Sequence, residues 1–140
     1  MKNLTLLMTL LIFANCSNTD SLDTGNCKNS ITSTQFIFCN AHSNNMVSAK
    51  DYYINKSINF KGKIWQIHES DGKIMIDLEP IDHKNIFETC YFTFTLAKSQ
   101  RELIKKYNVK DSINICGNYF ELKEAPTIYL FNFNNSIIQW

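Results

Sequence analysis

The stretch SINFKGKIWQIH, residues 57–68, is the part of the sequence that decides the predicted fold. Apolar and polar side chains alternate along much of it, as they do in a strand with one buried face. Gly62 interrupts the strand near its middle, and a glycine there indicates a bulge or a sharp bend. A bent strand can serve two sides of a closed sheet, so the rest of the chain is expected to supply the remaining strands.

Four further strands are expected downstream. GKIMIDLE (72–79) alternates well and ends at Pro80, and TCYFTFT (89–95) places Cys90 on its buried face together with two phenylalanines. SINICGNYF (112–120) is the fourth strand, and residues 127–138, rich in aromatic side chains, are the fifth. Polar turns or loops separate them at residues 70–72, 81–88 and 121–126.

Between the third and fourth strands the hydrophobic period changes from two to 3.6. Ser99 and Glu102 have the spacing of a capping box, and Leu103 and Tyr107 share one stripe, so a helix of about nine residues is expected after Ser99. Three strands, a helix and two strands is the element order of the OB-fold, a five-stranded Greek-key barrel. The sequence therefore predicts a mainly β OB-fold domain over residues 48–140, with one capping helix.

The chain begins with an expected export signal at residues 1–15. Lys2 precedes an apolar run at residues 4–14 that is too short to span a membrane. LIFANC (11–16) resembles a bacterial lipobox, in which cleavage makes Cys16 the first residue and its thiol carries diacylglycerol. Asn15 stands where Gly, Ala or Ser is usual. Ordinary signal-peptidase cleavage after Cys16, which would give a secreted protein, is the alternative.

Residues 16–47 are predicted to form a lipid-anchored tether and an irregular N-terminal segment. Residues 17–30 are polar and turn-prone, as a flexible tether would be. Ser17, by resemblance to enterobacterial sorting signals, points to the outer membrane and its periplasmic face. Residues 34–39 are short and apolar, and could be a strand or the start of a helix. A helix capped by Ser48 is expected to run to about Asn55.

The cysteines support export. With Cys16 carrying lipid, an even set of four remains, as expected in an oxidising compartment. Proximity in sequence favours a disulfide between Cys27 and Cys39. Cys90 and Cys116 are then either a second pair or two buried thiols.

The composition and motifs predict binding rather than catalysis. Lys plus Arg is 14 against 13 for Asp plus Glu, a net charge of +1, so nucleic acid is not the expected partner. No catalytic or phosphate-binding motif occurs, so we expect neither an enzyme, nor a cofactor, nor a metal site. His68 and His83 are interpreted as solvated loop residues, and Asp77 with Glu79 as a hydrated strand face. Trp65 and Tyr91 are the expected ligand contacts.

Four segments resemble bacterial OB-fold lipoproteins of the tRNA_anti-like family: FKGKIWQIH (60–68), CYF (90–92), DSINICG (111–117) and LFNFNNSII (130–138). The resemblance covers residues 48–138. It implies the OB-fold and supplies no catalytic residue. We therefore expect a domain held to the cell envelope by lipid on Cys16, which binds an envelope protein or a small ligand. A secreted binder of single-stranded nucleic acid or oligosaccharide is the alternative.

Replacing Cys16 by Ala tests the anchor. Without the thiol no diacylglycerol can be attached, so the unprocessed precursor should accumulate, as it should when globomycin blocks the lipoprotein signal peptidase. Immunoblotting of cell fractions measures this. Normal maturation of the Cys16→Ala variant would rule out lipidation at Cys16.

Overall fold

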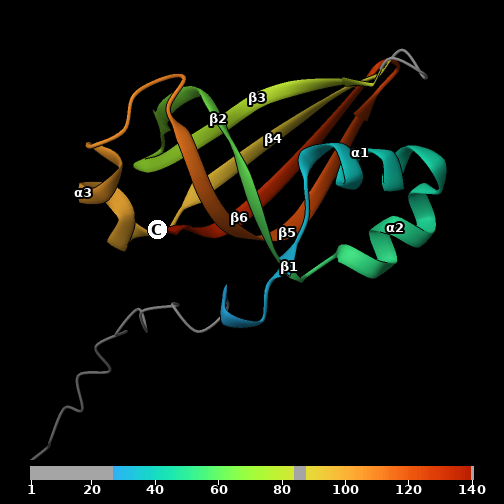
Figure 1. The fold of residues 1–140 in the computed structure, drawn as a ribbon, viewed down its shortest axis with the longest axis horizontal. Helices are drawn as coiled ribbons and strands as arrows, with labels where there is room; N and C mark the ends of the chain where they lie inside the picture. Colours follow the sequence, from blue (N-terminus) through green and yellow to red (C-terminus); the bar gives the residue numbers. More distant parts are fainter. Residues whose placement is uncertain (1–26, 84–87, 140) are drawn as a thin grey trace, which may run out of the picture.

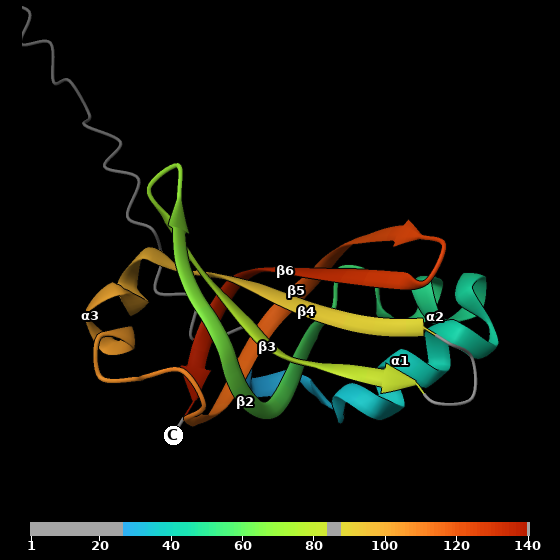
Figure 2. The ribbon, with the colours of Figure 1, turned by 90° about the horizontal axis from the view of Figure 1, so that it is seen from above.

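The computed structural model describes residues 27–83 and 88–139. The elements are β1 (Ile31–Thr32), α1 (Gln35–Asn44), α2 (Met46–Tyr53), β2 (Ser57–Ser70), β3 (Lys73–His83), β4 (Glu88–Leu96), the 3₁₀ helix η2 (Lys98–Gln100), α3 (Arg101–Ile104), β5 (Ser112–Ala125) and β6 (Ile128–Gln139). A barrel of strands occupies the centre, with α3 at one end and the α1–α2 pair at the other (Figures 1 and 2). Within these residues no helix has the length and apolar character needed to cross a membrane.

Five strands close into the OB-fold barrel that the sequence predicts. They follow the order β2-β3-β4-β6-β5, and β5 pairs back onto β2. β4 and β6 run parallel, and the other barrel neighbours are antiparallel. Closure is possible because β2 has two partners: residues 57–63 pair with β5, and residues 64–70 pair with β3. The predicted division of the first strand between two sides of the barrel is confirmed.

Gly62 lies next to the point where β2 changes partner. A Cβ atom there would stand 2.9 Å from Cδ1 of Leu78 and 3.0 Å from Oε1 of Gln35. A side chain at position 62 would therefore force the Leu78 and Gln35 side chains to shift. The irregular pairing expected nearby is present between Ile64 and Gln66.

Several predicted element limits are corrected. β3 continues through Pro80 to His83. Proline has no N–H to donate to the neighbouring strand, and the pairing with β4 shifts register between Leu78 and Ile81, so no hydrogen bond from Pro80 is needed. Likewise β5 extends to Ala125, so most of the turn expected at residues 121–126 belongs to a long hairpin with β6.

The expected helices also change. α3 has four residues rather than about nine, and its N-cap Gln100 makes no side-chain capping bond. The Gln100 carboxamide oxygen accepts instead from the Ile138 N–H of β6 (3.0 Å), and Glu102 pairs with Lys105. α2 begins at Met46 with Asn45 as its N-cap, because the Asn45 side chain accepts from the Ser48 N–H.

Residues 27–44, which we call the N-terminal arm, belong to the folded domain. The Ser33 N–H donates to the Asn59 carbonyl of β2 (3.0 Å), and Gln35 Nε2 donates to the Glu79 carbonyl of β3 (2.9 Å). The arm thus joins β2 and β3 where these strands no longer pair with each other. The prediction that residues 16–47 are tether or irregular is wrong for residues 27–47. Residues 16–26, with Cys16 and the predicted tether, and the signal at 1–15 lie outside the described residues.

α1 inserts an aromatic side chain into the end of the barrel. Phe38 is completely buried. Its ring centroid lies 4.5–6.0 Å from those of His42, Tyr53, Phe60, Phe92, Tyr119, Phe131 and Phe133. These neighbours come from both helices and four barrel strands, so one side chain connects the arm to most of the core.

Two disulfides fix the arm, and their pairing differs from the expected one. Cys39 bonds to Cys90 on β4, and Cys27 bonds to Cys116 on β5, with sequence separations of 51 and 89 residues. The predicted Cys27–Cys39 pair is wrong, because Cys39 faces the core from α1 whereas Cys27 precedes β1 and packs against β5 and β6. Cys90 and Cys116 are neither a pair nor free thiols.

Phe38→Ala and Ile37→Ala are matched truncations on the same helix. Phe38→Ala should lower the free energy of unfolding by about 3–5 kcal/mol, because it leaves a cavity in the core. Ile37, which is 55% exposed, should change it by less than about 0.5 kcal/mol. Urea unfolding of the oxidised protein measures both. Equal losses would contradict the proposed role of Phe38.

Candidate ligand-binding surface

Trp65 and Tyr91, the two residues predicted to contact ligand, lie together on the outside of the barrel. Their ring centroids are 5.9 Å apart. Tyr91 points outward because β4 alternates as expected, with Cys90, Phe92 and Phe94 buried. Trp65 is 46% exposed and lies where the pairing of β2 with β3 changes register. An aromatic contact surface therefore forms from two strands that are not neighbours in the sheet.

Leu130 extends this surface. It lies opposite Tyr91 in the parallel pairing of β4 with β6, and it is 37% exposed. We call Trp65, Tyr91 and Leu130 the outer aromatic face.

A row of polar side chains borders the outer aromatic face. Its residues are register partners across five strands: Gln66, Asp77, Thr93, Asn132 and Glu121. Thr93 Oγ1 donates to Asp77 Oδ1 (2.6 Å), and Asn132 Nδ2 donates to Glu121 Oε2 (3.0 Å). These bonds hold four of the side chains in place and include two carboxylates, of which Glu121 also lies 3.5 Å from Lys123 Nζ. The row can recognise hydroxyl or amide groups, and its Asp77 carboxylate disfavours phosphate.

The other residues considered in the sequence have unremarkable settings. His68 lies on β2 rather than in a loop, with Nδ1 3.6 Å from Asp77 Oδ2. His83 ends β3. Among the described residues no three or more His, Cys, Asp or Glu side chains are grouped to hold a metal ion. The absence of catalysis, of a cofactor and of a metal site remains a prediction.

His42 is a buried histidine in α1 that the sequence pattern did not single out. Its Nδ1 donates to the Phe38 carbonyl (2.9 Å), and aromatic rings surround it. Burial lowers its pKa from the usual value of 6.5. The signal was present, because Gln35, Phe38, Cys39 and His42 have helical i, i+3, i+4, i+7 spacing, but two of the four are polar. His42 is thus part of the core rather than of a binding site.

Comparison with known proteins supports the fold. The sequence matches no protein-family model and no curated protein. Among solved structures, it resembles a Klebsiella pneumoniae protein described as a "putative nucleic acid-binding lipoprotein", with 16% identity, a TM-score of 0.57, and coverage of 84% of this chain and 98% of that one. A "putative aspartyl-tRNA synthetase" from Leishmania major is 4% identical, with a TM-score of 0.47 over 79% of this chain and 21% of that one.

His42 makes stability depend on pH. Its pKa is lower in the folded than in the unfolded protein, so the unfolded state binds more protons below pH about 6.5. The free energy of unfolding should therefore fall between pH 7 and pH 5, by at most about 1.4 kcal/mol per pH unit from this group. His42→Phe should reduce the slope, whereas His68→Gln should leave the His42 contribution in place. Urea unfolding across this range measures it, and an unchanged slope in His42→Phe would be the contrary result.

Proposed function

We propose that this protein is an exported, lipid-anchored OB-fold domain that binds an envelope protein or a small envelope ligand without catalysis. The observation that carries the proposal is the outer aromatic face, where exposed Trp65 lies against Tyr91 beside a row of fixed polar groups. Partly exposed aromatic side chains are common at the centres of binding surfaces, since they bury a large area with few rotamers to fix.

The proposed location rests on two features. Four cysteines in two disulfides suit an oxidising compartment such as the bacterial periplasm. The leader and Cys16 would then supply export and the lipid anchor, with Ser17 directing the protein to the periplasmic face of the outer membrane. A lipoprotein-named neighbour of similar fold agrees with this location. Membership of the tRNA_anti-like family belongs to the same proposal, and secretion without lipid is its alternative.

A second candidate function is binding of single-stranded nucleic acid or oligosaccharide on the same face. Exposed aromatic rings such as Trp65 can stack on bases and sugar rings alike, and the Klebsiella protein is named for nucleic acid binding. Asp77 weighs against a phosphate backbone, because its carboxylate lies within the row that borders the rings, whereas the Glu121 carboxylate is paired with Lys123 Nζ (3.5 Å). Between the two ligands of this second candidate, the charges favour the glycan.

Site-specific photo-crosslinking in cells tests the first proposal. A p-benzoylphenylalanine placed at position 65 or 91 should give a discrete adduct, whereas the same group at position 52, a more exposed aromatic position on α2, should not. The adduct formed from position 65 should be lost in a Tyr91→Ala background. Equal labelling at positions 52 and 65 would remove the support for a specific surface.

Fluorescence titration separates the two candidates. If the first is right, oligonucleotides and glycan fragments should leave the tryptophan emission unchanged at physiological salt. Saturable binding of either polymer that Tyr91→Ala abolishes and Tyr52→Ala retains would establish the second candidate in its place.

A further inference from the structure

A trough separates the tip of the β2–β3 hairpin from α3, away from the outer aromatic face. Its larger part has a volume of about 390 Å³ and an apolar floor that includes Ile67, Ile74 and Ile104. A smaller hollow adjoins it, lined by Leu96 and again by Ile74. Small-molecule sites usually measure about 300–1,000 Å³, so the larger part alone is of ligand size. We call the two hollows together the hairpin trough.

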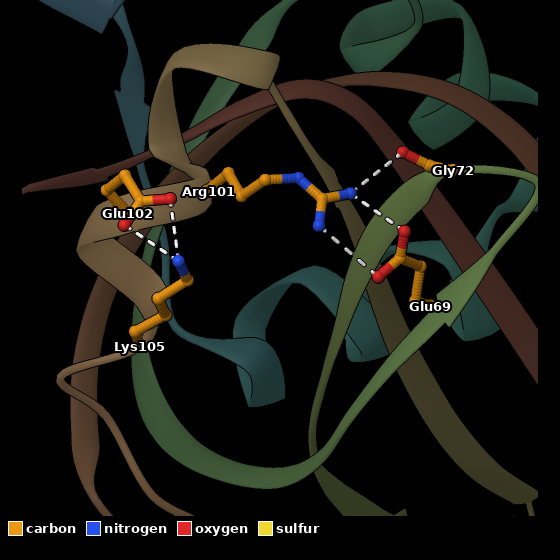
Figure 3. A network of polar contacts seen from close by, with 5 residues as sticks. All are labelled: Glu69, Gly72, Arg101, Glu102 and Lys105. Carbon is orange, nitrogen blue, oxygen red and sulfur yellow. Dashed lines mark hydrogen bonds and ion pairs between the residues drawn. The ribbon is translucent and has the colours of Figure 1, made fainter.

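Arg101 divides the hairpin trough, because it lines both hollows. Figure 3 shows its guanidinium reaching from α3 to the hairpin, where Nη2 donates to Glu69 Oε1 (2.8 Å) and to the Gly72 carbonyl (3.2 Å). This ion pair holds the pKa of Glu69 below its usual range, chiefly through the hydrogen bond from Arg101. Yet the two side chains are 45% and 50% exposed. Such exposed pairs contribute little to stability, so another anion can replace Glu69 at little cost.

The charges that line the hairpin trough are mainly positive. Lys73, Lys98, Arg101 and Lys105 line it, against the single carboxylate of Glu69. Lys105 is paired with Glu102 outside the lining (2.7 Å). Lys73 and Lys98 have no carboxylate within ion-pair distance in the described part of the chain, so an anion at this end of the trough would meet two uncompensated ammonium groups.

We propose that the hairpin trough binds an anionic amphiphile with a single alkyl or acyl chain. The anionic head group lies between Lys73, Lys98 and Arg101 and takes the place of the Glu69 carboxylate on the guanidinium. The chain lies on Ile67, Ile74 and Ile104. A free phosphate would leave this floor uncovered, and a neutral amphiphile would leave the cations without a partner. The inference does not depend on the proposed function, since it concerns a different surface and different residues.

Dodecyl phosphate below its critical micelle concentration is the probe. Added to the ¹⁵N-labelled chain from residue 16 onward with Cys16→Ser, it should shift the amide resonances of residues 67–74 and 98–107 saturably. Inorganic phosphate and dodecyl maltoside should shift them at least about tenfold more weakly, because each lacks one of the two required parts. Absence of saturable shifts in these two segments, or equal affinity for dodecyl maltoside, would overturn the proposal.

Charge variants test the head-group position. Lys73→Glu combined with Lys98→Glu should weaken dodecyl phosphate binding by about tenfold or more, whereas Lys50→Glu combined with Lys61→Glu, elsewhere on the surface, should not. Glu69→Gln should strengthen binding, since it removes the carboxylate that competes for Arg101. If the Arg101–Glu69 pair is purely structural, Glu69→Gln should leave dodecyl phosphate binding unchanged or weaken it. That result would contradict the proposal that the head group replaces the Glu69 carboxylate on Arg101.

Phosphatidylcholine vesicles that contain lysophosphatidylglycerol, an anionic lipid with one acyl chain, identify the source of the amphiphile. Co-sedimentation that is lost in the Lys73→Glu, Lys98→Glu variant would support a lipid of the bilayer as the ligand. With positive dodecyl phosphate shifts, absence of co-sedimentation would support a ligand taken up as a monomer.

Discussion

The fold depends on how the gap between β2 and β3 is closed. β2 leaves β3 near Gly62 to pair with β5, so the two strands diverge and their backbone groups need other partners. The N-terminal arm supplies them through Ser33 and Gln35, and its Phe38 then fills the end of the barrel. The disulfide at Cys39 holds α1 against β4, and the disulfide at Cys27 holds the start of the arm against β5. The arm thus adds hydrogen bonds and core packing where β2 and β3 of the closed barrel diverge.

The strands could be predicted from the sequence because their signal is local. The alternation of apolar and polar residues in 57–68 and 89–95 follows from the burial of one strand face. It is therefore the same whichever segment packs against that face. The end of β3 was wrongly predicted at Pro80, because a register shift allows a proline inside a strand. No local sequence pattern indicates such a shift. The short α3 was overestimated for a related reason, since Gln100 and Glu102 use their side chains for contacts with β6 and Lys105 instead of for capping.

The arm and the disulfides could not be predicted because they depend on contacts between distant segments. The buried face of α1 is not recognisable as an apolar stripe in the sequence, because Gln35 and His42 are polar. Each of these side chains nevertheless makes a hydrogen bond to a backbone carbonyl in the structure. Cysteine pairing has three solutions for four residues, and proximity along the chain favoured the wrong one. Trp65 and Tyr91 were chosen for their residue type and outward facing, and the structure brings them together. Neither the polar row nor the hairpin trough could be foreseen, because each requires strand register and the position of α3.

The two candidate surfaces place different chemistry on one small barrel. The outer aromatic face lies along the strands and offers rings beside carboxylates, whereas the hairpin trough lies next to α3 and offers cations above an apolar floor. A domain near a membrane surface could use one surface for a polymer or protein and the other for a lipid-like anion.

Disulfide mapping tests this account most directly. Proteolysis of the oxidised, alkylated protein without reduction, followed by mass spectrometry, should yield peptides that link Cys27 to Cys116 and Cys39 to Cys90. These two links require the arm to lie against both β5 and β4, as described above. A peptide that joins Cys27 to Cys39, or free thiols at Cys90 and Cys116, would contradict the account.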